Sequence, residues 1–392
     1  GQGYIGLPTA LMFAKSGVKV VGTDYNAELI QALQNGILTF EEDGLDELFK
    51  EARINGINFS TEYQTTDTYI ISVPTPYNKK TKKLDPSYVI SAAHSILEVC
   101  EKGAILIIES TVSPGTIDKY VRPEIEKKGY IIGEDVHLVH APERIIPGNM
   151  IYELEHNSRT IGADEKDIGE KVKELYSSFC KAEIVVTDIR SAEMSKVVEN
   201  TYRDINIAFA NELAKICRVD NMDVYEIIRI ANKHPRVNIL QPGPGVGGHC
   251  ISVDPWFLVG DYPDLTNLIL TARKTNDSMP THVLKRIRDI MREHNIRDIS
   301  RVGLYGLTYK ENVDDTRESP TLQLLERMDE HLAFGVKVFD PFVKERIVEH
   351  QFKSFEDFIN EIEIIVIMVG HDHIKNNMEL IKEKLILDTK NV

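Results

Sequence analysis

The sequence predicts an α/β protein with two Rossmann-like domains, joined by a central helical domain that is built on one long spine helix. Three observations lead to this fold class. A G-x-G-x-x-G turn opens the chain at Gly1, a helical pattern runs over residues 188–218, and strands and helices begin to alternate again at Val302. The expected domains are residues 1–187, 188–295 and 296–392.

The composition is that of a folded globular protein. The 392 residues are enough for several hydrophobic cores, and a content of 42% hydrophobic and 27% charged residues argues against disorder. A net charge of -15 argues against a general nucleic-acid or anionic-membrane surface. The longest apolar runs, such as residues 362–369, are far shorter than the ~20 residues of a membrane span. No signal peptide is visible, so we expect a cytoplasmic protein.

The turn at the start of the chain predicts a dinucleotide site. Its residues are Gly1, Gly3, Tyr4, Ile5 and Gly6. This pattern lets backbone amides and a helix N-terminus meet a pyrophosphate. A strand expected at residues 18–23 ends at Asp24, which is placed to hydrogen-bond a ribose diol and so favours NAD over NADP. The alternative is a glycine turn without a ligand. The first strand of the domain is expected to precede Gly1.

Two threonines follow predicted buried strands. Strands are expected at residues 69–73 and 105–109, and Thr75 and Thr111 lie just beyond their ends. Ligands of an open parallel sheet bind at the carboxyl ends of the strands, so both threonines are expected to line the cofactor crevice. The alternative is that either threonine caps a helix.

A carboxylate and a guanidinium follow a third predicted strand, residues 136–140. Glu143 and Arg144 emerge together there, in a loop that is bounded by prolines. From the sequence, a surface ion pair and a functional role are equally good interpretations.

The spine helix carries a polar stripe. Lys196, Asn200 and Arg203 are four and three residues apart and so share one side of the helix. A lysine and an amide one turn apart can hold a substrate oxygen while its proton and hydride leave; the alternative is a solvated face. A helix this long often forms a dimer surface, so we expect a homodimer or a dimer of dimers. The apolar residues expected to supply the packing faces are Val197, Val198, Ile205, Phe209, Leu213 and Ile216.

Residues 243–255 form a glycine- and proline-rich loop around one thiol, Cys250. Thiolate is a strong nucleophile toward a carbonyl carbon and a good leaving group, so it can carry a covalent acyl intermediate. Asp254 is near enough in sequence to accept a hydrogen bond from the group that attacks or leaves. The alternative is a small buried hydrophobe. Because the other cysteines, Cys100, Cys180 and Cys217, show no paired spacing, we expect a reducing compartment, no disulfide framework and no metal site.

The strand and helix pattern of a second βαβ domain follows. Strands are expected at residues 302–306, 336–340 and 362–369, with a helix over residues 320–334. Its first turn lacks the three glycines but offers Lys310 and Arg317, which suit phosphate or a pyrimidine nucleotide. We therefore expect a second, different nucleotide there.

Taken in order, these motifs resemble those of the UDP-glucose/GDP-mannose dehydrogenase family, and the resemblance runs from Gly1 nearly to the C-terminus. One motif could arise by chance, whereas the ordered set is specific. The motifs are Gly1-x-Gly3-x-x-Gly6, Val73-Pro74-Thr75-Pro76, Glu109-Ser110-Thr111, Pro142-Glu143-Arg144, Lys196-x-x-x-Asn200, Gly247-Gly248-His249-Cys250, Gly306-Leu307-Thr308-Tyr309-Lys310 and Asp315-x-Arg317-Glu318-Ser319-Pro320.

The resemblance implies a four-electron oxidation, in which two NAD and one water convert the C6 alcohol of a nucleotide sugar to a carboxylate. Lys196, or a water that it orients with Asn200, would assist proton loss from the alcohol. Cys250 would capture the aldehyde as a thiohemiacetal, which loses a second hydride to give a thioester. The candidates to position the hydrolytic water are Glu143, Thr111 and Asp254.

The resemblance also assigns residues that bind the nucleotides. Arg236 reaches a substrate in the partner subunit, Lys310 holds the uridine nucleotide, and Arg317 approaches the cofactor. The remaining residues expected in the sugar-nucleotide pocket are Arg144, Ile145, Arg203, His234, Gly247 and Tyr309.

The neighbours of the cysteine bear on which sugar is bound. His249 and Ile251, together with residues 142–144 and 147–148, look like the subgroup that acts on UDP-N-acetylhexosamines. The expected substrate is UDP-N-acetylmannosamine, and UDP-N-acetylglucosamine and UDP-glucose are the alternatives. Ser252 departs from the proline that is usual in this subgroup, which puts the rigidity of the loop in question. His249 either orients the acetamido group or only packs.

Two other classes of protein account for part of the sequence. A β-hydroxyacid-type dehydrogenase shares the NAD domain and the Lys-x-x-x-Asn helix, but it performs one oxidation without a thiol and needs no second βαβ domain. A catalytically inert sugar-nucleotide sensor would keep the folds without turnover. The NADH formed per sugar separates the three classes, at two, one and none.

Overall fold

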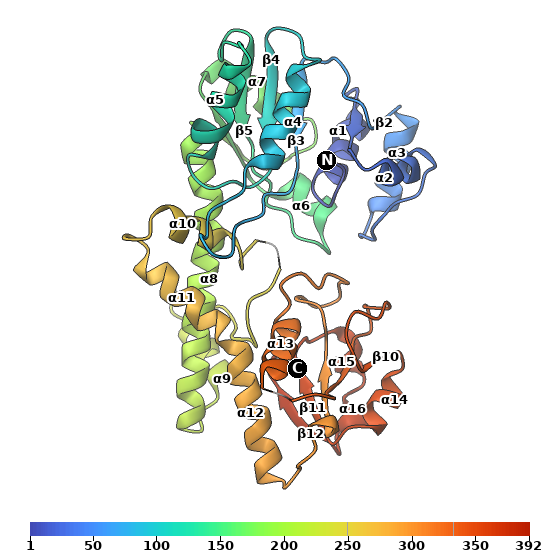
Figure 1. The fold of residues 1–392 in the computed structure, drawn as a ribbon, viewed down its shortest axis with the longest axis vertical. Helices are drawn as coiled ribbons and strands as arrows, with labels where there is room; N and C mark the ends of the chain where they lie inside the picture. Colours follow the sequence, from blue (N-terminus) through green and yellow to red (C-terminus); the bar gives the residue numbers. More distant parts are fainter. Residues whose placement is uncertain (249, 332) are drawn as a thin grey trace. The chain divides into compact units, whose positions relative to one another are not determined.

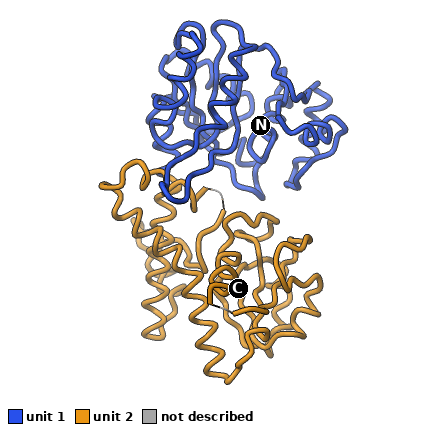
Figure 2. Tube along the Cα trace, viewed as in Figure 1, with its two compact units in different colours: residues 1–198 blue, residues 199–392 orange. Residues whose placement is uncertain are grey.

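The computed structural model describes residues 1–248, 250–331 and 333–392. This part of the chain forms two compact units, Gly1–Val198 and Glu199–Val392, and the boundary between them falls within the long helix α8 (Ile189–Val219; Figures 1 and 2). The expected division into three domains stays a prediction.

The N-terminal unit contains two sheets. The smaller sheet pairs β1 (Val21–Thr23) with β2 (Asn58–Ser60) in parallel. The larger sheet has the order β3-β4-β5-β6-β7 and is parallel except between β5 and β6. Its strands are β3 (Thr68–Ile71), β4 (Ala104–Ile108), β5 (Val136–His140), β6 (Arg159–Ala163) and β7 (Ile184–Thr187). A cavity of about 360 Å³ lies between the edges of β1 and β3.

Helices pack around these sheets. They are α1 (Gly6–Lys15), α2 (Ala27–Gln34), α3 (Leu45–Ile54), α4 (Ser87–Leu97), a π-helical turn (Ile117–Val121), α5 (Arg122–Lys127), α6 (Met150–His156) and α7 (Lys166–Tyr176). The main core joins α1 and α3 to the strands through apolar side chains such as Leu11, Leu48 and Ile107. All five residues of β4 are buried, as a strand covered on both faces requires.

The C-terminal unit begins with helices and ends with a parallel sheet. After α8 come α9 (Val224–Ala231), α10 (Asp254–Asp261), α11 (Asn267–Asp277) and α12 (Met279–Glu293). The sheet has the order β10-β9-β8-β11-β12. Its strands are β8 (Val302–Tyr305), β9 (Lys337–Phe339), β10 (Gln351–Phe352), β11 (Ile364–Ile367) and β12 (Leu385–Asp388). The other elements are a 3₁₀ turn (Ile299–Arg301) and the helices α13 (Pro320–Glu330), α14 (Phe355–Asn360), α15 (Asp372–Asn376) and α16 (Met378–Ile381).

Alternate residues of these strands face two cores. Leu304 and Val366 pack on one face of the sheet, with side chains of α12 and α13, whereas Tyr305 and Ile365 pack on the other face, with α14. This alternation is the period of two that a strand imposes on its side chains. The predicted α/β fold class, with parallel sheets and a long central helix, is confirmed.

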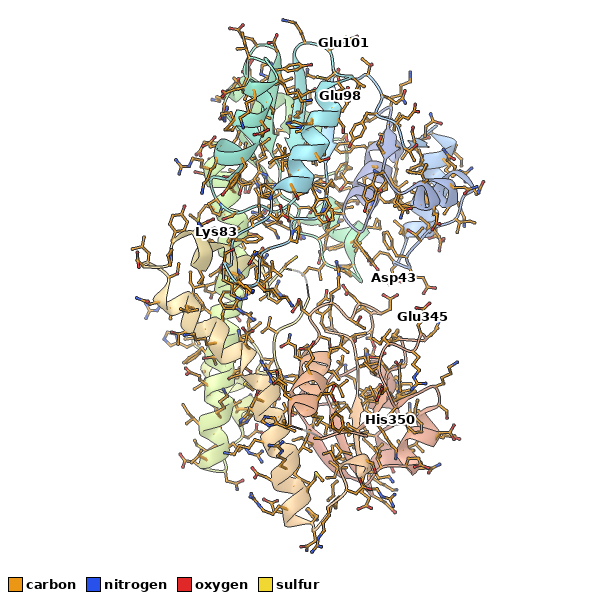
Figure 3. All side chains as sticks on the ribbon, viewed as in Figure 1. Asp43, Lys83, Glu98, Glu101, Glu345 and His350 are labelled. Atoms are coloured by element: carbon orange, nitrogen blue, oxygen red, sulfur yellow. The ribbon has the colours of Figure 1, made fainter. Side chains whose placement is uncertain are left out.

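The strand and helix ends differ little from the expected ones. Residues 18–20, 72–73, 331 and 333–334 were expected inside elements and lie outside them, because the regular hydrogen bonding of the neighbouring element does not extend to them. No described helix is long and apolar enough to cross a membrane. Ionisable side chains are exposed on both units (Figure 3). Those labelled in the figure are Asp43, Lys83, Glu98, Glu101, Glu345 and His350.

Candidate active site

The glycine turn packs tightly against the end of β3. A Cβ on Gly1 would collide with the carbonyl oxygen of Ser72, and a Cβ on Gly6 would collide with the carbonyl oxygen of Gly1. A Cβ on Gly3 would meet no described atom within 4 Å. Two glycines therefore allow close packing, whereas the third leaves open space beside the N-terminus of α1. This is the arrangement that a pyrophosphate needs.

The other predicted cofactor residues lie beside this turn. The Asp24 carboxylate accepts hydrogen bonds from the backbone N–H groups of Gln2, at 2.7 Å, and Asn26, at 2.9 Å. It is half-buried and still has lone pairs for a ribose diol. Tyr4 and Ile5 pack against the core, and the Tyr4 ring lies 4.4 Å from that of Phe40. These two residues therefore offer backbone groups to a ligand.

The loops that carry Thr75 and Thr111 are joined by one serine. The Ser110 hydroxyl accepts a hydrogen bond from the Val73 N–H at 2.8 Å and donates to the Val73 carbonyl at 2.7 Å. Thr75 is buried and Thr111 is half-buried. Both lie at the carboxyl ends of adjacent parallel strands, as expected.

Glu143 belongs to a buried ionic network. Its carboxylate forms an ion pair with Arg159, at the start of β6, and accepts a hydrogen bond from the Arg144 N–H at 2.6 Å. Arg159 also lies 4.0 Å from the carboxylate of Glu109 and stacks over the Tyr176 ring. Burial, and then the charge of Glu143, raise the pKa of Glu109 to about 7. The ion pair of Glu143 is thus internal, and Arg159 was not singled out from the sequence.

Arg144 points elsewhere. Its guanidinium donates hydrogen bonds to the Thr160 hydroxyl at 3.1 Å and to Ser158. The next residue, Ile145, is buried in the core of the N-terminal unit. The ion pair that the structure shows for Glu143 is the buried one with Arg159.

The buried side of α8 is polar. Lys196 and Asn200 are both buried, with 6% and 5% of their surface exposed. Glu193, one turn before Lys196, accepts hydrogen bonds from the N–H groups of Gly115 and Ile117, and burial raises its pKa to about 7. It anchors the segment that follows Thr111. Sequence analysis missed Glu193 because its partners are 76 and 78 residues away.

The residues of α8 that were singled out differ in exposure. Arg203 is exposed, whereas Lys196 and Asn200 are buried. The buried position next to it is Asp204, which forms an ion pair of 2.6 Å with Arg273 of α11. Val198, Phe209 and Ile216, assigned to packing faces, are also exposed, because apolar spacing alone does not say which side of a helix is covered.

The cysteine loop ends at a buried amide–carboxylate pair. The Asn200 side-chain amide donates a hydrogen bond of 2.6 Å to the Asp254 carboxylate at the start of α10. The Asp254 N–H donates to the carbonyl of Cys250 at 2.8 Å. Cys250 is itself exposed, so the interpretation as a buried hydrophobe is wrong. The two bonds tie an accessible thiol to the helix that carries Asn200. His249 lies outside the described residues.

The glycines before the thiol touch the C-terminal sheet domain. A Cβ on Gly247 would lie 2.6 Å from the carbonyl oxygen of Glu318 and 2.7 Å from the Cβ of Tyr309. Gly248 has a φ of +82° and donates its N–H to the Arg317 carbonyl at 2.9 Å. The structure thus brings together Gly247, Tyr309 and Arg317. The Arg317 guanidinium pairs with Asp315 at 2.6 Å.

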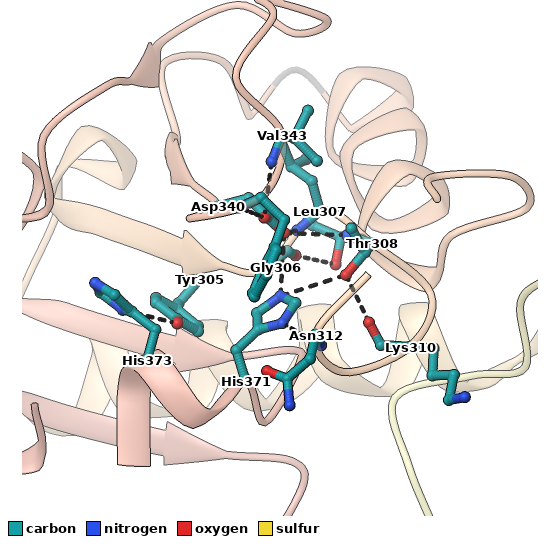
Figure 4. Close-up of polar contacts among 12 residues, drawn as sticks. Tyr305, Gly306, Leu307, Thr308, Lys310, Asn312, Asp340, Val343, His371 and His373 are labelled. Carbon is teal, nitrogen blue, oxygen red and sulfur yellow. Dashed lines mark hydrogen bonds and ion pairs between the residues drawn. The ribbon is translucent and has the colours of Figure 1, made fainter. Parts of the chain in front are cut away.

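A buried cluster holds the first turn of the second βαβ domain (Figure 4). The Asp340 carboxylate, at the end of β9, accepts hydrogen bonds from the N–H of Leu307 at 2.6 Å and of Thr308 at 3.2 Å. His371 Nδ1 accepts from the Asn312 N–H at 2.9 Å, so its Nε2 carries the proton and faces Asp340. Although burial opposes it, the hydrogen bond from His371 keeps the pKa of Asp340 below its usual value. The one feature of the sequence that could have identified this cluster is Asp340, an acid at the end of a predicted strand.

The other predicted substrate residues are exposed. Lys310 lies on the same turn, and its carbonyl accepts a hydrogen bond from the Thr308 hydroxyl at 2.8 Å. His234 and Arg236 follow α9, and the Arg236 N–H donates to His234 Nδ1 at 3.3 Å. Among the described residues, no cluster of His, Cys, Asp and Glu could hold a metal ion.

The structure combines a glycine turn beside an acidic residue, a thiol on a loop, and a second βαβ domain suited to a nucleotide. This combination defines an NAD-dependent dehydrogenase with a separate nucleotide-binding domain. The comparisons with known proteins agree. Three sequence profiles of the UDP-glucose/GDP-mannose dehydrogenase family match, namely the NAD binding domain at residues 1–180, the central domain at 190–278 and the UDP binding domain at 303–392. The chain therefore belongs to this family. It is an NAD-dependent UDP-sugar dehydrogenase.

Several relatives are similar along the whole chain. A UDP-N-acetyl-D-mannosamine dehydrogenase of Methanocaldococcus jannaschii is 43% identical, over 100% of this chain and 91% of that protein. An NDP-N-acetyl-D-galactosaminuronic acid dehydrogenase of Ralstonia nicotianae is 37% identical, over 100% and 94%. The solved structure of the UDP-N-acetyl-mannosamine dehydrogenase Cap5O of Staphylococcus aureus is 45% identical and has a TM-score of 0.89, over 100% and 94%.

Proposed function

We propose that the protein oxidises the C6 alcohol of UDP-N-acetyl-D-mannosamine to the carboxylate, through a thiohemiacetal and a thioester on Cys250. The observation that carries this proposal is the exposed thiol, held by Asp254 and Asn200 at the end of a glycine loop. The choice of sugar rests on the relatives named for this substrate, which are 43% and 45% identical.

In the first oxidation, Lys196 and Asn200 would bind the C6 oxygen while it loses a proton and C6 loses a hydride. The product is an aldehyde. NAD accepts the hydride when it is bound. Both side chains are buried, so their hydrogen bonds to an oxyanion would be stronger than in water, at about 3 kcal/mol for a good donor.

In the second oxidation, the Cys250 thiolate would add to the aldehyde carbon and form a C–S bond. The resulting thiohemiacetal would lose its hydroxyl proton and a second hydride, for which a second NAD would be the acceptor, and become a thioester. Water then attacks the thioester carbon, the C–S bond breaks, and the carboxylate and the thiol are released. Glu143, Thr111 and Asp254 are the proposed residues to position or activate this water. Glu143 fits this role because Arg159 and the Arg144 N–H orient its carboxylate.

The nucleotides would be held by residues of both units. The residues proposed to bind the cofactor are Gly1, Gly3, Tyr4, Ile5, Gly6, Asp24, Thr75, Thr111 and Arg317. The residues proposed to bind the UDP sugar are Arg144, Ile145, Arg203, His234, Gly247, Tyr309 and Lys310. We also propose a homodimer in which Arg236 reaches the partner's substrate, since Arg236 is exposed.

The test is the amount of NADH formed per sugar, with UDP-N-acetylmannosamine, UDP-N-acetylglucosamine and UDP-glucose as separate substrates. We expect two NADH per UDP-N-acetylmannosamine and much slower reaction of the other two. One NADH per sugar would instead identify a single-step dehydrogenase. Reaction of UDP-glucose alone would overturn the choice of sugar but leave the chemistry intact.

A further inference from the structure

A cavity of about 440 Å³ lies within the C-terminal unit, and none of the residues assigned above to NAD or to the UDP sugar lines it. It is bounded by the end of α8, the start of α9, the first half of α12, the end of β12 and residues 242–244. Its volume is within the range of small-molecule sites, about 300–1,000 Å³.

The polar lining of this cavity includes three basic side chains. Arg218, His282 and Arg286 line it from two helices, and no described carboxylate lies within 4 Å of either guanidinium. The Nε atom of Arg286 is buried and has no hydrogen-bond partner among the described residues. A buried donor without an acceptor costs about 1–3 kcal/mol, so an acceptor at this place would stabilise the protein.

Two acids also line the cavity, and backbone groups already use their oxygens. The Asp223 carboxylate caps α9 and accepts from the Tyr225 N–H at 2.9 Å. The Asp388 carboxylate accepts from the N–H groups of Lys390 at 2.8 Å, Asn391 at 2.9 Å and Val392 at 2.7 Å. These hydrogen bonds fix the positions of the two carboxylates and occupy part of their lone pairs.

Burial and neighbouring positive charges disfavour the charged forms of Arg286 and His282. Burial, followed by the charge of Arg218, lowers the pKa of Arg286 to about 10. Burial, followed by the charges of Lys215, Arg286 and Arg218, lowers the pKa of His282 to about 4. Arg286 also faces Tyr225 and Asp388, which favour its charged form but do not offset these effects. An anion among these groups would relieve the repulsion.

We propose that this cavity binds a small anion with a phosphate or diphosphate group, as a site separate from those for NAD and the UDP sugar. The planar guanidinium groups of Arg218 and Arg286 suit the paired oxygens of such a group. Met222, Val224 and Met279 supply an apolar side for the rest of the ligand.

The cavity shares a wall with the segment that leads to the thiol. Pro242, Gly243 and Pro244 line it, and the Gly243 N–H donates a hydrogen bond of 2.9 Å to the Asn211 side chain. Asn211 in turn donates to Asn276 at 2.8 Å. A ligand in the cavity would therefore contact Gly243, which is seven residues before Cys250 in the sequence. The buried side-chain amides of Asn211 and Asn276 hold this wall in place.

The first test is titration of the full-length protein, free of nucleotides, with inorganic pyrophosphate in a calorimeter at low salt. We expect saturable binding that weakens about tenfold in Arg218→Gln and in Arg286→Gln, which corresponds to the loss of about 1.4 kcal/mol. Arg288→Gln, an exposed change on the same helix, is the matched control and should bind as the wild type does. Unchanged affinity in Arg218→Gln overturns the proposal, even if Arg286→Gln fails to fold.

The second test follows the titration of His282 by NMR, with His282→Gln to assign its signal. Pyrophosphate in the cavity should raise the pKa of His282, because an anion stabilises the imidazolium. An unchanged His282 titration at saturating pyrophosphate would place the anion elsewhere and overturn the proposal.

Discussion

Asn200 and Asp254 are 54 residues apart in the sequence, yet their buried side chains meet at 2.6 Å. Because the Asp254 N–H also holds the Cys250 carbonyl, the position of the thiol depends on a residue of α8. The cysteine could be singled out from the local sequence, since four glycines precede it between residues 243 and 248. The partner of Asp254, in contrast, could not be identified from spacing, because nothing in the local sequence says which helix the loop contacts.

Replacement of the thiol tests the covalent step. Cys250→Ser should stall after the first oxidation or accumulate a slowly hydrolysed ester, because a hydroxyl is a poorer nucleophile and leaving group than a thiolate. We expect steady-state NADH formation to fall by on the order of 10³-fold or more. The control is Cys100→Ser, which changes a half-buried thiol of the N-terminal unit. Two NADH per sugar at the wild-type rate in Cys250→Ser would contradict the covalent route.

The buried Glu109 makes stability depend on pH. Its pKa is about 7 in the folded protein and about 4.5 in the unfolded chain, so the folded state favours the protonated form. This contribution to stability is fully present below about pH 4.5 and is lost as the pH rises through about 7. Glu109→Gln removes the titration. The free energy of unfolding of the wild type, relative to this variant, should therefore fall between pH 4.5 and 7 and level off above.

The measurement for Glu109 is urea unfolding of both proteins over that pH range. Glu98→Gln, which changes an exposed carboxylate of the same unit, is the control for the loss of one carboxylate. A constant difference between the wild type and Glu109→Gln would mean that Glu109 titrates near its ordinary pKa.

At the scale of elements, the apolar strands were predictable and the polar partners were not. Strand β5 (Val136–His140) has the expected bounds, and the other strands differ at their ends. A run of buried apolar residues identifies a strand without reference to the rest of the fold. Arg159, Glu193 and Asp204 were missed, since each is a charged residue in a regular element whose burial depends on a distant partner.

The contact between the cysteine loop and the second βαβ domain can be tested by a substitution that adds one methyl group at Gly247. Gly247→Ala would place a Cβ 2.6 Å from the Glu318 carbonyl oxygen, so the loop or the turn at Tyr309 must shift. We expect kcat/KM for the UDP sugar to fall by about tenfold or more, since such a shift costs about 1–3 kcal/mol. Gly243→Ala, whose Cβ would come no nearer than 3.9 Å to its neighbours, should stay close to the wild type. Equal activity of the two variants would contradict the close approach.

At the scale of the whole molecule, the exposed side of α8 indicates how two copies of the chain would associate. Tyr202, Phe209 and Ile216 recur every seven residues and are 61%, 50% and 56% exposed. Seven residues make nearly two turns of an α-helix, so the three side chains form one apolar stripe. The sequence pattern assigned Phe209 and Ile216 to packing faces, but a period identifies an apolar side of a helix and not what covers it. A contiguous apolar stripe on a globular surface is typical of a protein interface.

We therefore expect the stripe of Tyr202, Phe209 and Ile216 to form the homodimer interface, and Phe209→Glu tests this. A carboxylate there would have to lose its water on association, which costs several kcal/mol without a cationic partner. Light scattering after size exclusion should give about twice the chain mass of 44.4 kDa for the wild type and a shift toward 44.4 kDa for Phe209→Glu. Leu268→Glu, which changes an exposed leucine on α11, should leave the dimer intact. A dimer that is unaffected by Phe209→Glu would place the interface on another surface.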